Sequence, residues 1–462
     1  MRLILKPVAL LTLLALPLVA LALQAPPVHE HRLANGMKVI VKQDSRAPIA
    51  VTQVWYRVGS SYEPNGITGI SHALEHMMFK GTQKYGPNQF SELIAEQGGQ
   101  ENAFTGRDYT AYFQTLANDR LEIAFELEAD RMRNLLLDEK EFAKEIRVVQ
   151  EERRLRTEDK PKSFTYEKFN ATAYRASPYR NPIIGWMSDL ESMRIDDLKA
   201  WYQRWYAPNN AILVVVGDVQ PEQIVALAEK YFGPLPPSEL TPLKPEVEPP
   251  QMGEVRLKVK APAKEPYLLM GYKTPVLGHA DAEWEPYALD MLQAVLDGGS
   301  SARIEKELVR GRQIAVSAGA SYSSFSRLPA MLSLSGIPAE GHSIAELEQA
   351  LRGEIERLRA EPISQREMER VRNQLLAAKV YERDSVFYQA MQIGMLETIG
   401  LDWRLAENYV ERMRQVTPEQ VQAVARKYLV ADNLTLAELV PQPMDKPRGF
   451  ARPLISGGRH GG

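Results

Sequence analysis

The chain has 462 residues, a length that predicts two or three domains, each with a sizeable core. Its formal net charge of −3 argues against a dedicated nucleic-acid binder, because such proteins usually carry a strong basic excess. It contains no Cys, which excludes disulfides, iron–sulfur clusters and a cysteine nucleophile, so any metal must be held by His and carboxylate side chains.

The N-terminus has the pattern of a secretory signal peptide. Arg2 and Lys6 form a short basic region, an apolar run follows as far as Ala20, and Ala22 and Ala25 continue the small residues suited to cleavage. The run is short for a membrane anchor and holds two prolines, so we expect cleavage within residues 1–25, after Ala22 or after Ala25. We expect an exported protein, in the periplasm, with no stable membrane span.

Strand patterns open the mature chain at residues 37–42 and 49–58. Helical patterns follow at about 68–80, 88–97, 119–135 and 138–157, with strands near 100–106 and 109–117 between them. Hairpins and helices therefore come in runs rather than in strict alternation. This arrangement predicts an α+β fold, with a mainly antiparallel sheet packed against helices.

A Pro-rich stretch at residues 233–250 has no periodic apolar pattern and is predicted to be an extended linker. It separates a first half, residues 26–232, from a second half, residues 251–440. The tail at residues 441–462 is rich in Gly, Pro and Arg and is predicted to be flexible.

The two halves end alike. When the last segments of the two halves are aligned, Trp205 corresponds to Tyr428 and Asn210 to Asn433. Both segments are predicted to form a helix, a turn and a buried strand. Because the match runs through helix, turn and strand without a gap, we interpret it as an internal duplication. Two homologous halves should then share one fold.

The densest cluster of chemically useful residues is His72-Ala73-Leu74-Glu75-His76. Two His residues four apart on a helix project from one face, so both imidazoles can reach one ion, and Glu75 shares that face. The pattern is H-x-x-E-H, the inverted form of a zinc motif. The alternative is a surface helix with solvated side chains, and it is disfavoured because surrounding apolar residues give this helix a packed face.

A third ligand should lie on another acidic helix, and residues 139–156 have that pattern. Glu145 and Glu152 are seven apart, which places them two turns apart on one helical face. We expect the remaining charged residues of this helix to form a solvated face: Glu141, Glu151, Arg153, Arg154 and Arg156.

These features resemble the pitrilysin/insulinase family of zinc peptidases. That family has H-x-x-E-H, a third-ligand Glu at a characteristic distance after the second His, and another Glu seven positions before that ligand; Glu152 and Glu145 stand at these two positions. Further similarities lie at residues 102–112, 182–185 and 206–218, and the resemblance covers about residues 28–440.

The resemblance implies that His72, His76 and Glu152 bind Zn²⁺. It makes Glu75 the general base, which takes a proton from the attacking water and later protonates the leaving amine. Glu145 would be a supporting catalytic carboxylate beside the metal ligands.

The resemblance also implies how the substrate binds. Asn102, Ala103 and Phe104 would lie on an edge strand to which an extended peptide substrate adds as a further strand. One departure concerns an Arg and a Tyr, seven apart in the second half of catalytically complete relatives, which contact the substrate carbonyl. Val309 and Val316 stand at those positions, and the second half has no H-x-x-E-H.

This departure implies that the chain is the metal-bearing subunit of a heterodimer, and that a homologous subunit supplies the Arg/Tyr pair. Two functions follow. The first is an exported zinc endopeptidase that hydrolyses peptides or unfolded segments. The alternative is a non-catalytic family member that acts as a binding or scaffold subunit; the intact His72, Glu75, His76 and Glu152 favour the first.

Overall fold

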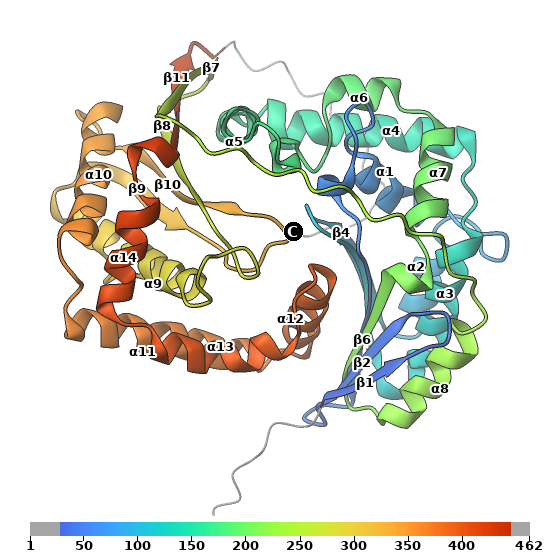
Figure 1. Cartoon of the computed structure of the whole chain (residues 1–462). Coiled ribbons are helices and arrows are strands. Elements are labelled where there is room, and N and C mark those ends of the chain that lie inside the picture. Colours follow the sequence, from blue (N-terminus) through green and yellow to red (C-terminus); the bar gives the residue numbers. More distant parts are fainter. Residues whose placement is uncertain (1–27, 445–462) are drawn as a thin grey trace, which may run out of the picture.

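A computed structural model describes residues 28–444, which form two sheets, each packed against helices, on opposite sides of the molecule (Figure 1). The predicted signal peptide at residues 1–25 and all but the first four residues of the predicted tail lie outside the described residues. Within residues 28–444, no helix combines the length and the apolar composition that crossing a bilayer requires.

The first sheet belongs to the first half of the chain. Its strand order is β1 (Val28–Arg32), β2 (Lys38–Gln43), β6 (Ala211–Gly217), β3 (Ile49–Tyr56), β5 (Thr110–Ala117) and β4 (Gln100–Thr105). β2 and β6 are parallel and the other neighbours are antiparallel, which confirms the predicted mainly antiparallel sheet. β4 lies at the edge, so the outer side of its backbone has no partner strand among residues 28–444.

The second sheet repeats the topology of the first from β2 to β4, and no described strand corresponds to β1. Its strand order is β7 (Val255–Pro262), β11 (Leu434–Gln442), β8 (Tyr267–Thr274), β10 (Ala330–Pro338) and β9 (Ala315–Ser321). Again one pair, β7 with β11, is parallel, and the other pairs of this sheet are antiparallel. β9 therefore occupies the edge position that β4 has in the first sheet.

Equivalent elements of the two halves are related by two constant offsets in residue number. At the first shift, α7 (Ile195–Trp205) and β6 recur as α14 (Pro418–Tyr428) and β11, which confirms the expected helix and strand. At the second, slightly shorter shift, α1 (Ile70–Met77), α2 (Gln89–Glu96) and β4 recur as the starts of α9 (Glu285–Asp297), the helix η6 (Ile304–Gly311) and β9. The internal duplication therefore extends to the motif helix α1, whose counterpart in the second half is α9.

The remaining helices complete the layers, and two of them are exchanged between the halves. α5 of the first half packs against the second sheet, where Phe169 contacts Leu269 and Ala437. α12 of the second half packs against β3 and β6 of the first sheet. These helices are α3 (Leu121–Asn134), α4 (Glu139–Arg153), α5 (Pro161–Ala173), α6 (Met187–Ser192), α8 (Pro221–Tyr231), α10 (Ile344–Ala360), α11 (Gln365–Glu382), α12 (Val386–Thr398) and α13 (Arg404–Gln415).

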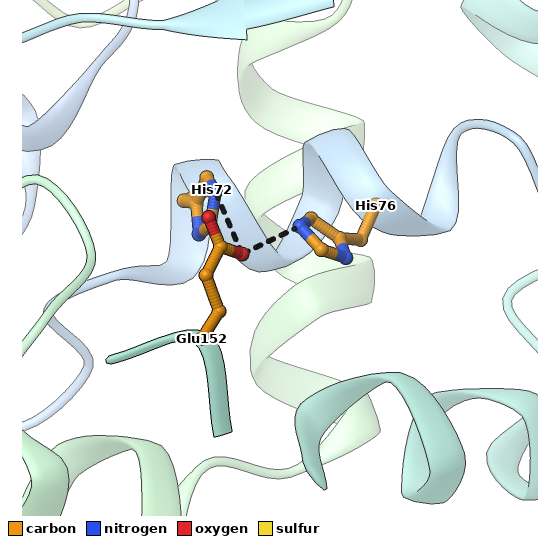
Figure 2. A group of neighbouring side chains, drawn as sticks. All are labelled: His72, His76 and Glu152. Carbon is orange, nitrogen blue, oxygen red and sulfur yellow. Dashed lines mark ion pairs between the residues drawn. The ribbon is translucent and has the colours of Figure 1, made fainter. Parts of the chain in front are cut away.

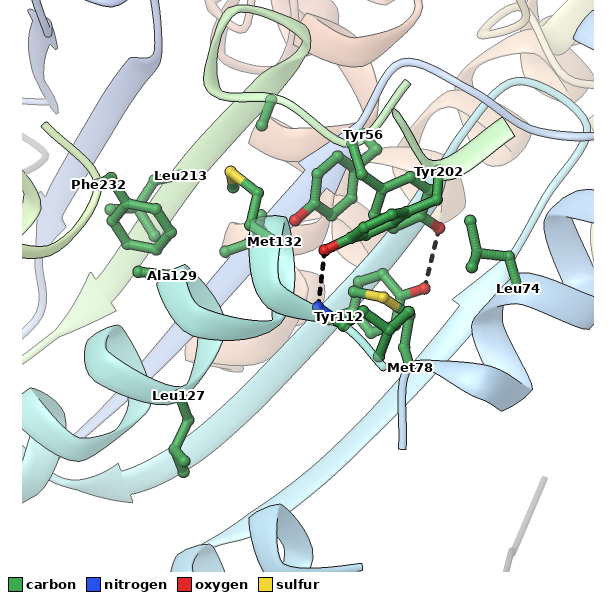
Figure 3. Close-up of a cluster of buried hydrophobic side chains, with 14 of the residues drawn as sticks. Tyr56, Leu74, Met78, Tyr112, Leu127, Ala129, Met132, Tyr202, Leu213 and Phe232 are labelled. Atoms are coloured by element: carbon green, nitrogen blue, oxygen red, sulfur yellow. Dashed lines mark hydrogen bonds between the residues drawn. The ribbon is translucent and has the colours of Figure 1, made fainter. Parts of the chain in front are cut away.

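The core of the first half fixes the orientation of α1. Leu74 of α1 packs among buried side chains from the sheet and from α3, including Tyr56, Tyr112 and Met132 (Figure 3). Burial of the apolar face of α1 removes it from water, and this drives the helix onto the sheet. The two His residues are thereby turned away from the core and toward the carboxylates of α4.

Residues 236–250 form neither helix nor strand and run between the two halves. Near their end the Glu248 carboxylate accepts backbone N–H groups of Arg175 and Ser177 from the first half and the Lys273 ammonium from β8. The segment is thus tied to both halves. The domain boundaries drawn from the sequence stay a prediction.

Candidate metal centre

The N-terminus of α1 is fixed by a buried carboxylate from outside the helix. Gly69 and Ser71 donate their N–H groups to Glu63 at 2.7 and 2.9 Å, so two of the amides that a helix leaves unpaired have partners. Burial raises the pKa of Glu63 to about 7. Gly69 has φ +87°, and a Cβ there would lie 2.5 Å from the Ile184 carbonyl oxygen, so this entry into the helix requires glycine.

Three of the predicted site residues converge, two from α1 and one from the end of α4 (Figure 2). The Nε2 atoms of His72 and His76 lie 3.8 and 3.4 Å from the same oxygen, Glu152 Oε2. One ligand atom from each residue lies within 4.8 Å of the others. The three side chains are mostly buried but retain some exposure, so a small ion or a water molecule can reach them.

These three side chains fit a zinc ion. His72 makes no hydrogen bond through its buried Nδ1, and its Nε2 is farther from Glu152 than a hydrogen bond allows. Two ligand atoms about 2.0–2.1 Å from one tetrahedral centre lie roughly 3.3–3.4 Å apart, close to the 3.4 Å between His76 and Glu152. Two imidazoles and one carboxylate are also a ligand set that zinc accepts in catalytic sites.

The electrostatics of the group indicate a place for a cation. Burial alone lowers the pKa of His76, but the carboxylates of Glu145 and Glu152 outweigh burial and raise it to about 9. His72 behaves in the opposite way: burial and the neighbouring His76 lower its pKa to about 4. One proton on His76 thus balances part of the carboxylate charge, and a divalent ion could do the same.

A second layer of contacts orients the candidate ligands. Glu145 Oε2 lies 3.3 Å from Nδ1 of His76, and Lys80 holds the other oxygen of Glu145 at 2.8 Å. Arg156 holds Oε1 of Glu152 at 2.7 Å and leaves Oε2 facing the two His residues. Such contacts fix the tautomer and the direction of a ligand; the supporting role of Glu145 stays a prediction.

The prediction that Arg153 lies on a solvated face is wrong. Its guanidinium is 4% exposed, pairs with Glu167 at 2.7 Å and donates to the Gly185 carbonyl oxygen at 2.8 Å. Arg153 therefore ties the end of α4 to α5 and to the segment before α6. The helical charge pattern could not reveal this, because the partners come from other elements.

Glu75 lies beside the candidate metal ligands and has a hydrogen-bond partner of its own. The Thr105 hydroxyl, at the end of β4, donates to Glu75 Oε2 at 2.5 Å. Burial raises the pKa of Glu75, against the opposing effect of this hydrogen bond. The carboxylate is thus held in one orientation with a raised proton affinity, and both properties suit a group that exchanges a proton near neutral pH.

The predicted substrate strand is the edge strand β4. Gly106 donates its N–H to Tyr109, so by alternation the backbone groups of Phe104 and Asn102 face β5, while those of Ala103 and Thr105 face the free edge. At that edge the Asn102 side chain accepts the Ala103 N–H at 2.9 Å. To pair with Ala103, a peptide would have to accept this N–H in place of the Asn102 side chain. The Phe104 ring packs against Trp55 and Tyr109, away from the edge.

The second half holds a degenerate copy of the motif, which the sequence patterns did not reveal. The shift that relates α1 to α9 matches His72, Glu75 and His76 to Tyr287, Asp290 and Met291. Only a carboxylate is retained, and it is partly buried, with Oδ2 accepting hydrogen bonds from Ser324 and Tyr409. The motif helix had changed too much for a sequence match, and equivalent positions in the fold were needed to find it.

The positions of the missing Arg/Tyr pair lie on η6 and β9. Val309 packs against the core of the second half, and Val316 is 58% exposed on the edge strand β9. Neither side chain has a hydrogen-bond donor for a substrate carbonyl.

Comparisons with known proteins agree with this picture. Residues 38–186 match the model described as "Insulinase (Peptidase family M16)", and residues 192–375 match "Peptidase M16 inactive domain", so the two together cover more than half of the chain. A zinc protease PqqE of Helicobacter pylori is 35% identical over 294 residues, which are 63% of this chain and 65%, just under two thirds, of that relative.

Two solved structures share the fold. A protease from Helicobacter pylori has a TM-score of 0.85 and 28% identity, and the match covers 90% of this chain and 100% of that one. The periplasmic protease PqqL from Escherichia coli has a TM-score of 0.75 at 17% identity, and this chain covers only 51% of it. Both family models, the related zinc protease and the shared two-sheet fold lead to one conclusion: the chain belongs to the pitrilysin/insulinase family of peptidases, family M16.

Proposed function

We propose that this chain is a zinc-dependent endopeptidase that hydrolyses peptides or unfolded protein segments. The observation that carries the proposal is the convergence of His72, His76 and Glu152 beside Glu75, next to the open edge of β4. Three observations on the described part of the chain support it. The buried Nδ1 of His72 makes no hydrogen bond there, two carboxylates surround the imidazole of His76, and the outer edge of β4 pairs with no other described strand.

In this proposal His72, His76 and Glu152 hold the metal, and Glu145 keeps His76 oriented. Bound zinc would supply Lewis-acid activation of the attacking water and of the substrate carbonyl. Glu75 takes a proton from the water at its carboxylate and later delivers it to the leaving amine nitrogen. Thr105 keeps this carboxylate turned toward the reacting groups. Ala103 and its neighbours Asn102 and Phe104 form the strand beside which the peptide extends.

We further propose that the active form is a heterodimer with a homologous subunit, and that the chain is exported to the periplasm. Val309 and Val316 provide no donor where catalytically complete relatives have Arg and Tyr, and removing one such donor typically costs about 10²–10³ in rate. The solved PqqL chain, of which this chain spans about half, is long enough to hold two such units. The leader-like pattern at residues 1–25 supports export.

The decisive experiment replaces Glu75 by Gln and measures zinc content and peptide hydrolysis, alone and with a co-expressed homologue of the same family. We expect zinc content near that of the native chain and a loss of about 10²–10⁴-fold in turnover, because the amide cannot accept the proton. Glu151→Gln, at an exposed carboxylate next to Glu152, is the matched control and should change neither quantity. Turnover within twofold of the native chain in Glu75→Gln would remove Glu75 from the mechanism.

A scaffold or binding subunit is the second candidate function. The observation in its favour is the match of residues 192–375 to a domain described as inactive, together with the missing Arg/Tyr pair. The same experiment separates the two functions. A scaffold subunit would show no hydrolysis in the native chain under either condition, whether or not it binds zinc.

A further inference from the structure

One loop of the second half reaches the candidate active site of the first half. This loop, residues 322–329 between β9 and β10, meets the turn between β4 and β5 at residues 106–109. Arg327 donates from its backbone N–H and from Nε to the two oxygens of Asp108, at 3.2 and 3.4 Å. Its Nη2 also donates to the carbonyl and hydroxyl oxygens of Ser61, at 3.0 and 2.8 Å.

The carboxylate that Arg327 binds is buried. Asp108 is 5% exposed and also accepts hydrogen bonds from the Ser61 hydroxyl and the Tyr179 hydroxyl, both neutral donors. Arg327 forms the ion pair that balances its charge. A buried carboxylate that loses its cation is strongly destabilised where it lies, so the turn that carries Asp108 would have to shift or admit water.

This turn leads directly to the candidate general base. Thr105 immediately precedes it and donates its hydroxyl hydrogen to Glu75. Ser60 and Ser61 donate their N–H groups to the carbonyl oxygens of Gly106 and Arg107, at 3.2 and 2.7 Å, so the turn is also linked to Ser61, which Arg327 binds. If Asp108 moved, Thr105 and the free edge of β4 would therefore move with it.

The other end of the loop is anchored in its own half. The Ser324 hydroxyl donates to Asp290 at 2.7 Å, and the Ser324 carbonyl oxygen accepts the Leu277 N–H at 3.0 Å. The Tyr322 hydroxyl donates to the Pro275 carbonyl oxygen at 2.6 Å. Because the loop is fixed in both halves, it links them at a defined position through Arg327. Asp290, the counterpart of the candidate base Glu75, is thus part of the anchor.

We propose that Arg327 is a positioning residue of the active site: by binding Asp108 and Ser61 it holds the β4–β5 turn, and through Thr105 it fixes the orientation of Glu75. This inference rests on the proposed role of Glu75. The role is distinct from metal binding, because Arg327 contacts none of the candidate ligands.

The test compares Arg327→Met with Arg404→Met. Arg404 also forms an ion pair across the halves, to Glu30 of β1, but far from the β4–β5 turn in the sheet order. We expect Arg327→Met to lower kcat by about ten- to a hundredfold with KM and zinc content within twofold of the native chain. Amide hydrogen exchange should rise in residues 102–110. Arg404→Met should change none of these quantities.

A double-variant cycle with Thr105→Val separates positioning from a general structural effect. If Arg327 acts through Thr105, the double variant should lose little more than Thr105→Val alone, because the two changes remove one connected interaction. Fully additive losses, an equal loss in Arg404→Met, or kcat within twofold of the native chain in Arg327→Met would each overturn the inference.

Amide exchange keeps the inference testable if the proposed function fails. A native chain that binds zinc but hydrolyses nothing would reject the peptidase proposal. In that case, faster exchange of residues 102–110 in Arg327→Met, absent in Arg404→Met, would still support the role of Arg327 in ordering the turn. Unchanged exchange would overturn it.

Discussion

The partly buried Asp290 of the degenerate site should give the protein a measurable dependence of stability on pH. Burial raises the pKa of Asp290 from 3.8 to about 6, despite its hydrogen bonds from Ser324 and Tyr409. Between about pH 4 and pH 6 the native state therefore binds more protons than the unfolded state, so the free energy of unfolding falls as pH rises. A rise of the pKa from 3.8 to about 6 corresponds to a free energy of unfolding lower by about 3 kcal/mol at pH 7–8.

Asp290→Asn should remove this fall in the free energy of unfolding. Both hydrogen bonds go to one oxygen, Oδ2, so the Asn carbonyl oxygen can accept them, while the side chain stays neutral at every pH. We expect the variant and the native chain to unfold alike at pH 4–5, and the variant to be more stable by up to about 3 kcal/mol at pH 8. Because the Ser324 contact is kept, zinc content should not change.

The assay is the thermal unfolding midpoint across pH 4–8, measured for both chains in the same buffers with a chelator present. The difference between the two curves cancels every titrating group except Asp290. Asp119→Asn, at an exposed carboxylate, is the control, and its unfolding midpoint should equal that of the native chain at all pH values. If the curves of Asp290→Asn and the native chain stay parallel from pH 4 to pH 8, the argument from burial is wrong.

Three further outcomes follow from the structure. His76→Ala should bind no zinc and should lose the rise in unfolding midpoint that added zinc gives the native chain, which a thermal scan with and without zinc measures. Lys80→Met should weaken zinc affinity by about 10–100-fold in a chelator competition, because Glu145 loses its cation, whereas Lys144→Met on the exposed face of α4 should not. Gly394→Ala should destabilise the protein by about 1–3 kcal/mol or more in chemical denaturation, because its Cβ would lie 2.1 Å from Nε1 of the buried Trp55.

Some of the candidate site could be predicted from the sequence because it depends on local geometry. His72 and His76 share a helical face whatever surrounds the helix, since residues at i and i+4 always do. Glu145 and Glu152 share a face of α4 because seven residues make about two helical turns. That α4 is the helix that meets α1 came from the resemblance to a family and not from periodicity, because a charge pattern does not specify a neighbour.

The regular elements were predicted for a similar reason. Alternating and 3.6-residue apolar patterns record which face of each strand or helix is buried. They placed the strands and helices between residues 37 and 157 within a few residues of their observed bounds, whereas β1, α5, α6 and α8 were not predicted. The duplication was visible where α14 and β11 kept residues similar to those of α7 and β6. It was hidden at α9, where Tyr287 and Met291 had replaced the two His residues.

The tertiary structure alone decided the contacts between distant segments. In it α5 packs against the second sheet and α12 against the first. Arg153 is buried against Glu167, and Arg327 of the second half binds Asp108 of the first. The partner of a charged side chain is chosen by the packing of whole elements, because burial of a charge requires an opposite charge at that point in space. Local sequence determines which face of an element is polar; the fold determines what that face meets.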